Sequence, residues 1–172
     1  MSNKKSIDEL INIISLSRER INYRLNEIYD LDEPGSSGNT LLMAASAGGR
    51  LLEIQLLLEK GASINATGHY NLTALHEASS NGERGAAILL ISAGANVNAV
   101  TIQAVTPLMC AAAWGYYEVA QILLDAGADL NKKDKMGANA IDIAQEKGEL
   151  HTVFFLKNMS GLKLEVQHLN PR

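Results

Sequence analysis

The amino-acid sequence predicts an all-α solenoid, in which short helix-turn-helix units stack in a row and project hairpin loops from one side. Three observations predict this fold class. Similar segments recur every 33 residues along the chain, each begins with a residue type that starts helices, and glycines recur where helices should end. A strict period of this length is typical of repeat architectures, in which each unit contacts only its neighbours.

Residues 1–34 do not match the repeat, and we expect them to form an N-terminal helical cap over the open apolar edge of the first unit. Ser6 and Glu9 have the spacing of a capping box. An apolar stripe follows at Ile7, Ile11, Ile14, Ile21, Leu25 and Ile28. The alternative is a coiled coil, which the interruption at Arg18 and a length of fewer than four heptads disfavour.

Each unit then begins with a short first helix. Thr and Asn side chains can cap a helix, and they occupy one column of the repeat at Thr40, Thr73, Thr106 and Asn139. Pro107 follows at the first helical position, which tolerates proline. The helix should end at a glycine that adopts the left-handed conformation, in the column Gly49, Gly82, Gly115 and Gly148.

A second helix and a polar loop complete the unit. Val119, Ile122 and Leu123 show the helical spacing of the second helix, which should end at Gly61, Gly94 or Gly127. The loop contains an asparagine that can bond a turn, at Asn65, Asn98 or Asn131. Two short helices cannot bury their apolar faces alone, so neighbouring units must stack. Alanine permits that close approach, and it repeats at Ala45, Ala78, Ala111 and Ala144.

Four such units span residues 35–158, with boundaries near 35–66, 67–99, 100–132 and 133–158. The fourth lacks the glycine-alanine ending of the others, and we expect Phe154 and Phe155 to close the stack there. Residues 159–172 form a C-terminal tail. Its alternating Leu162, Leu164 and Val166 fit an extended segment folded back on the stack, and a disordered tail remains the alternative.

The segments "TALHEA", "TPLMCAA" and "GADLN" resemble the ankyrin-repeat family, whose signature is T-P-L-H-x-A on a 33-residue repeat. The four units depart from it in part, because only the third keeps the proline and only the second keeps the histidine, as His76. The resemblance implies that His76 and Thr73 form a structural hydrogen-bonding pair. Met43 and Met109 would replace that polar bridge by hydrophobic packing.

Composition excludes several classes of function. The formal net charge of −4 supplies no basic field for nucleic acid, and Lys132, Lys133 and Lys135 enclose Asp134 as in a solvated loop. The single cysteine forms no intrachain disulfide and suits a reducing compartment. Acidic and polar residues interrupt the apolar run that a signal peptide needs, and no run is long enough to span a bilayer. We therefore expect a cytoplasmic protein without nucleic-acid or membrane partners.

No constellation of catalytic or metal-binding residues is visible. The four histidines, His69, His76, His151 and His168, do not converge in the repeat. Cys110 stands among Met109 and alanines, which gives no reason for a lowered thiol pKa. Asp125, Asp129 and Asp134 do not fit a calcium loop. We expect no enzyme activity, no cofactor and no metal.

The resemblance implies that loop tips and the exposed side of the first helices form one concave surface for a partner. Repeat one would contribute Ser36, Ser37, Asn39, Ala47 and Gly48, and repeat two His69, Tyr70, Leu72, Ser80 and Asn81. Repeat three would contribute Ile102, Gln103, Val105, Ala113 and Trp114, and repeat four Lys135, Met136, Ala138, Glu146 and Lys147.

Trp114, the only tryptophan, lies outside the leucine and alanine columns of the core, so we expect it to be exposed. For the same reason we expect an exposed apolar stripe that also includes Tyr70, Leu72, Ile102, Val105 and Met136. The alternative is that Trp114 packs against Tyr116, Tyr117 or the next repeat.

These features favour a monomeric, non-enzymatic protein-protein interaction module that binds one partner through its concave face. Inhibiting, masking or chaperoning that partner is favoured over an adaptor role, which would need a second recruiting surface. A bacterial immunity protein that neutralises a toxin is one specific case. The alternatives are a structural protein that self-associates through the helix at residues 7–28, and an enzyme with a site that the sequence does not reveal.

Overall fold

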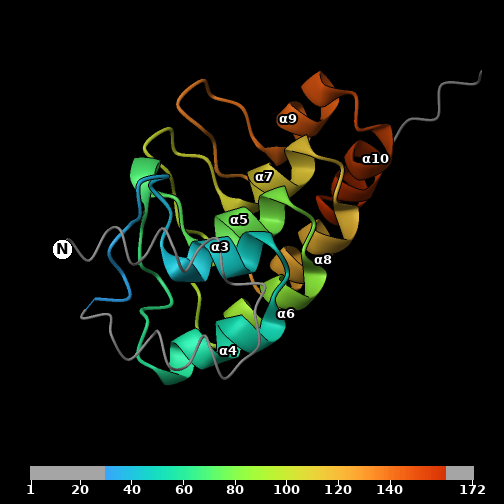
Figure 1. Ribbon diagram of the computed structural model, residues 1–172. Coiled ribbons are helices and arrows are strands. Elements are labelled where there is room, and N and C mark those ends of the chain that lie inside the picture. The colour runs from blue at the N-terminus through green and yellow to red at the C-terminus, as the bar shows by residue number, and fades with distance from the viewer. Residues whose placement is uncertain (1–29, 162–172) are drawn as a thin grey trace, which may run out of the picture.

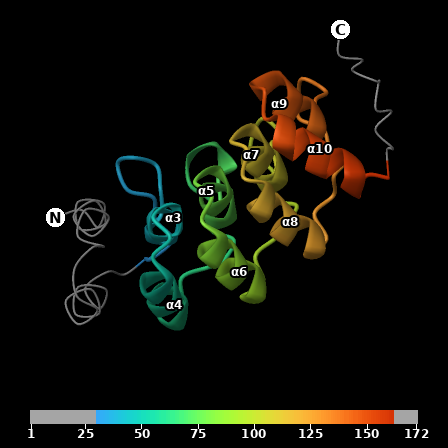
Figure 2. The ribbon, with the colours of Figure 1, turned by 90° about the vertical axis from the view of Figure 1, so that its right-hand side faces the viewer.

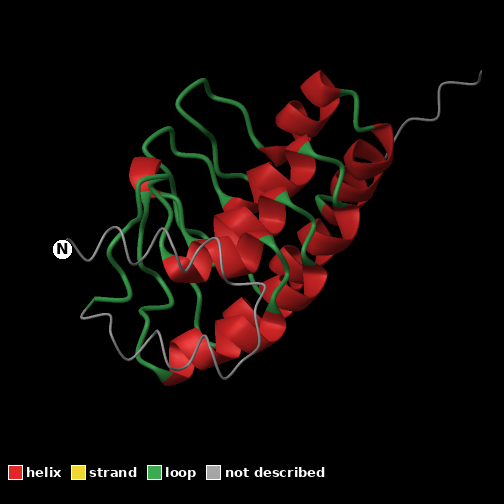
Figure 3. Cartoon of the chain, in the orientation of Figure 1, coloured by secondary structure: helices red, strands yellow, loops and turns green. Residues whose placement is uncertain are grey.

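The computed structural model describes residues 30–161, and in that part of the chain every regular element is a helix (Figure 3). The all-α prediction is confirmed. The predicted cap helix falls almost wholly within residues 1–29 and the tail within residues 162–172, both outside the described residues. The elements are α3 (Leu41–Ala47), α4 (Leu51–Glu59), η1 (His69–Asn71), α5 (Ala74–Ser80), α6 (Arg84–Ser92), α7 (Pro107–Ala113), α8 (Tyr117–Asp125), α9 (Ala140–Lys147) and α10 (Leu150–Met159).

The helices form two layers (Figures 1 and 2). The first helices of the units, α3, α5, α7 and α9, lie side by side in chain order, and each packs against the next. The second helices α4, α6, α8 and α10 form the other layer, and each pairs with the first helix of its own unit. The loops that join the units all project on the same side of the stack. This arrangement confirms the predicted solenoid.

Each first helix begins at the predicted cap. The backbone N–H of Met43 donates to Thr40 Oγ1 at 3.2 Å, and that of His76 donates to Thr73 Oγ1 at 3.4 Å. In three units the residue at the third helical position also accepts a hydrogen bond from the N–H of the cap. The acceptors are His76 Nδ1 for Thr73, Met109 Sδ for Thr106 and a carboxylate oxygen of Asp142 for Asn139.

The third unit differs from the expectation, because the sulfur of Met109 accepts a hydrogen bond. Packing was expected to replace the polar bridge there, but Met109 Sδ lies 3.4 Å from the N–H of Thr106 and keeps the role of acceptor. A thioether is a weak acceptor, so the bond satisfies a buried donor at a site that is otherwise hydrophobic.

Glycines end the helices where the sequence predicts. Gly82 follows α5 with a φ of 72°, and Gly94 follows α6 with a φ of 90°. The turn at Gly82 also has no room for a side chain, because a Cβ there would meet the ring of Tyr116 from the next repeat. Glycine at this column therefore permits both the left-handed turn and the close approach of the neighbouring unit.

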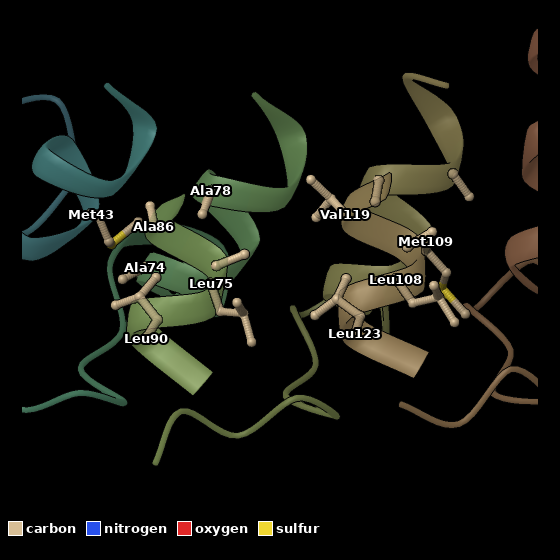
Figure 4. Close-up of a cluster of buried hydrophobic side chains, with 14 of the residues drawn as sticks. Met43, Ala74, Leu75, Ala78, Ala86, Leu90, Leu108, Met109, Val119 and Leu123 are labelled. Carbon is tan, nitrogen blue, oxygen red and sulfur yellow. The ribbon is translucent and has the colours of Figure 1, made fainter. Parts of the chain in front are cut away.

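The core lies between the two layers and runs through the stack (Figure 4). Leu75 and Leu90 fill it in the second repeat, and Leu108 and Leu123 are the equivalent residues in the third; all four are buried. The predicted alanine column is buried at Ala45, Ala78, Ala111 and Ala144. Because these columns are continuous from unit to unit, the fold has one core rather than four.

The end of the stack differs from the expectation. Val153 and Leu156 of α10 are the residues that turn inward, whereas Phe155 is half-buried and Phe154 is exposed. The expectation that both phenylalanines close the stack is wrong for Phe154. Its neighbour Val153 already takes the inward position, and adjacent residues on a helix point about 100° apart.

Candidate functional site

Backbone hydrogen bonds tie the loop tips of neighbouring repeats together. His69 N donates to Gly38 O at 2.8 Å, Ile102 N donates to Tyr70 O at 2.9 Å, and Lys135 N donates to Gln103 O at 3.0 Å. One backbone–backbone bond thus joins the two tips at each junction. We use the name tip face for the surface made by three parts of each repeat. These are the tip (residues 35–39, 68–72, 101–105 and 134–138), the first helix and the turn that ends this helix.

Each tip is also held by bonds of its own. In the third repeat Thr101 N donates to Val105 O at 3.0 Å, and Thr101 Oγ1 accepts from Val105 N at 3.1 Å. In the fourth, one carboxylate oxygen of Asp134 accepts from the N–H groups of Met136 and Ala138, both at 2.9 Å. The tips therefore present their side chains from an ordered backbone, which lowers the entropy lost on binding.

Four large apolar side chains are exposed on the tip face. Met136 is 92% exposed, Tyr70 68%, Trp114 64% and Ile102 41%. They come from consecutive repeats, two, three and four, and the bond from Ile102 N to Tyr70 O places two of them on adjoining tips. The predicted exposure of these four residues is confirmed.

The tyrosines that were the alternative neighbours of Trp114 pack elsewhere. Tyr116 lies against the turn at Gly82. The ring of Tyr117 meets His151 edge-on, with centroids 4.8 Å apart, and lies 6.2 Å from Phe155. Among the rings of residues 30–161, none stacks on the indole of Trp114. Because Trp114 is 64% exposed, the alternative in which it packs against Tyr116, Tyr117 or the next repeat is wrong.

Two members of the predicted stripe are not exposed. Leu72 and Val105 are half-buried and pack against the core. Each directly precedes the cap of a first helix, at Thr73 or Thr106, and an apolar residue at this position commonly folds onto the helix that follows. The expected exposed stripe therefore shrinks to Tyr70, Ile102, Trp114 and Met136.

The other predicted positions vary in exposure. The exposed ones are Ser36, Ser37, Gly48, His69, Asn81, Gln103, Lys135, Glu146 and Lys147. The half-buried ones are Asn39, Ala47, Ser80, Ala113 and Ala138.

Glu77 is a residue of the tip face that sequence reasoning missed. It lies in α5 one turn before Ser80 and Asn81, and the side-chain amide of Asn81 donates to Glu77 O at 2.9 Å. Its side chain is half-buried, and burial raises the pKa of its carboxyl above the ordinary value. The signal was available, because residues three and four apart on a helix share a face.

Burial limits the chemistry of two titratable groups of the first helices, the imidazole of His76 and the thiol of Cys110. His76 is buried, with Nδ1 facing Thr73 and Nε2 bonded to Val105 O at 3.1 Å. Burial raises the pKa of the Cys110 thiol to about 11, so it stays protonated at neutral pH and is a poor nucleophile. Within residues 30–161 no three His, Cys, Asp or Glu side chains gather as metal ligands would. That same stretch holds no helix with the length and apolar character of a bilayer span.

Comparisons with known proteins agree with this architecture. A family model described as ankyrin repeats (3 copies) matches residues 4–101, and one described as ankyrin repeat matches residues 105–135. The first match includes most of the segment for which the sequence predicts a cap, so that assignment stays a prediction. The α9–α10 pair lies beyond both matches, and its place in the repeat comes from its stacking on α7 and α8.

One curated relative is M-phase phosphoprotein 8 of Homo sapiens. It is 47% identical to this chain over 49 residues, which make up 28% of the chain and 6% of the human protein. The likeness therefore concerns a small part of that protein.

Proposed function

Because the chain belongs to the ankyrin-repeat family, we propose that it binds one protein partner through the tip face, the concave surface of such a stack, and that it inhibits, masks or chaperones that partner. Ankyrin repeats indicate a protein-protein interaction module, which is the coarse function of this chain. The choice of face, the single partner and the effect on that partner are the proposed part.

The exposure of Trp114 carries the proposal. Tryptophan and tyrosine are typical anchors of protein interfaces, because they bury a large area with few rotatable bonds. An indole and three further large apolar side chains are exposed to water on one face, and exposed apolar side chains that gather in this way usually mark an interaction site. The bonds between tips support the same proposal, since they fix the backbone of Tyr70 and Ile102 on adjoining repeats before a partner binds.

The chemistry of the first helices supports binding without catalysis. The only imidazole within them, His76, uses both ring nitrogens to join α5 to its cap and to the next tip. The thiol of Cys110 is buried with a raised pKa. The side chains left exposed on the tip face are mostly neutral or apolar, which fits recognition of another protein surface. We propose that the protein acts as a monomer in the cytoplasm, where Cys110 stays reduced.

The test is capture of partners by wild type and by Trp114→Ala side by side, followed by measurement of the affinity for the captured partner. We expect Trp114→Ala to weaken binding by about 30-fold, the equivalent of about 2 kcal/mol, with the thermal midpoint almost unchanged. The matched control is Ile88→Ala, which removes an exposed apolar side chain from α6 in the other layer. It should leave binding intact, and equal capture by all three proteins would contradict the proposal.

A further inference from the structure

The charge distribution of the tip face is uneven. Across the first three repeats, the tips and the helices α3, α5 and α7 contain no lysine or arginine and a single acid, Glu77. The turns after these helices add Arg50, beside Gly48, and Glu83, whose carboxylate lies against Gly49 of the preceding repeat. The next basic residue after α5 in the chain, Arg84, belongs to α6, and its guanidinium nitrogen lies 3.0 Å from a carboxylate oxygen of Glu118. Glu77 is thus the one acid within the tips and first helices of these three repeats.

The surroundings of Glu77 leave its carboxylate partly dehydrated. It is half-buried on α5 beside Ser80, with the buried thiol of Cys110 across the junction on α7. Burial raises its pKa, and no lysine or arginine of the described chain forms an ion pair with it. The free protein therefore holds this charge without a compensating cation.

A partner that covers the tip face would remove the remaining water from Glu77. Burying an ionised carboxylate without a partner costs several kcal/mol, so binding requires either a cation opposite the carboxylate or the uptake of a proton. A lysine or arginine of the partner would meet no cation on the tips or first helices of the first three repeats. Electrostatic complementarity of this kind fixes the register of a bound segment.

We propose that the partner places a lysine or arginine side chain on Glu77, next to the apolar residue that it places on Trp114. This inference rests on the proposed function and specifies the partner that the tip face fits. Glu77 and Trp114 lie on neighbouring first helices, whose axes are roughly 10 Å apart. In an extended partner segment the basic and apolar residues would therefore be about three positions apart.

The test uses a library of random peptides displayed on phage and selected on the full-length chain. We expect enriched peptides that need Trp114 and carry a lysine or arginine near an aromatic or aliphatic residue. Selection on Glu77→Lys should exchange the basic residue for aspartate or glutamate. Selection on Glu118→Lys, a carboxylate on the second-helix layer, should return the same peptides as wild type.

The affinity of a selected peptide at different pH values distinguishes a cation from proton uptake. With a cation, affinity falls as the pH drops through the raised pKa of Glu77, and Glu77→Gln weakens binding about tenfold or more at neutral pH. With proton uptake, affinity rises as the pH drops and Glu77→Gln binds at least as well. The titratable groups near Glu77 and on the rest of this surface remain in Glu77→Gln, so the difference between the two proteins reports Glu77. These groups are His76, Cys110, His69, Tyr70, Arg50, Glu83, Lys135, Asp142, Glu146 and Lys147.

The outcomes separate the two proposals. Peptides that depend on Trp114 but carry no basic residue, or a profile of proton uptake, would overturn the role of Glu77 and leave the proposed function intact. A selection that yields no peptide dependent on Trp114 would overturn the binding role of the tip face itself, and the role of Glu77 with it.

Discussion

His76 Nε2 donates a hydrogen bond to the carbonyl oxygen of Val105 over 3.1 Å, which joins α5 of the second repeat to the tip of the third. A carbonyl oxygen only accepts, so Nε2 carries the proton. The N–H of Thr73 only donates, so Nδ1, 3.3 Å from it, carries none. The imidazole is therefore neutral, and a second proton would break the bond to Thr73 and place a charge in the core.

This geometry predicts a stability that depends on pH. Burial is the main cause that lowers the pKa of His76 below its ordinary value of 6.5, and the bond to Val105 partly opposes it. The unfolded chain then binds a proton below 6.5 that the folded chain does not, so the free energy of unfolding falls as the pH drops below 6.5. The slope from this group is at most about 1.4 kcal/mol per pH unit.

Urea unfolding of wild type and His76→Met between about pH 7.5 and about pH 5 measures this contribution. Methionine holds the same position in the first and third repeats, so it is compatible with the fold there. The carboxylates contribute equally to the pH dependence of unfolding in both proteins, so their contributions cancel in the difference between the two. If the free energies of unfolding of the two proteins fall in parallel as the pH drops, His76 is not the group that causes the loss of stability.

Ala104 occupies a left-handed conformation, with a φ of 60°. Glycine stands at the equivalent place in the first and fourth tips, as Gly38 and Gly137. The strain of a Cβ there, about 1–2 kcal/mol, exceeds the extra chain entropy of glycine, so we expect Ala104→Gly to stabilise the protein by about 0.5–1 kcal/mol.

Thermal or urea unfolding tests the change at Ala104. Asn71→Gly is the graded control, because Asn71 has the same conformation in the second tip, with a φ of 59°, and asparagine tolerates it better than alanine. It should gain less stability than Ala104→Gly. A loss of stability in Ala104→Gly would mean that the methyl group of Ala104 contributes more packing than its backbone costs in strain.

Gly94, which follows α6, has a φ of 90°. A Cβ at this position would meet no atom within 4 Å, so the expected cost of a side chain comes from the backbone and not from a clash. We predict that Gly94→Val destabilises the protein by about 1–3 kcal/mol, because a β-branched residue resists this conformation. Gly94→Asn should cost less, and an unchanged midpoint in Gly94→Val would show that the turn can rearrange.

The period of the sequence predicted the helices, their caps and the glycines that end them, since each depends on residues close together in the chain. It also predicted the exposure of Trp114, because that residue lies off the columns of the core. It failed at Leu72 and Val105, because a loop residue that directly precedes a helix cap folds inward onto the core. The helical spacing from Ser80 and Asn81 could have indicated Glu77, but its partial burial depends on packing between repeats, which the sequence does not show.

The hydroxyl of Thr152 is buried in α10 and forms no hydrogen bond in the described part of the chain. The equivalent residue one repeat earlier, in α8, is Val119, which is also buried. A buried hydroxyl without a partner costs about 1–3 kcal/mol, and valine has nearly the same shape without the polar group. We therefore predict that Thr152→Val stabilises the protein by about 1 kcal/mol, measured by urea unfolding.

The control Thr152→Ser keeps the hydroxyl, loses a methyl group and should destabilise the protein by about 1 kcal/mol. Loss of stability in both variants would indicate that the hydroxyl of Thr152 has a partner in solution, such as a bound water.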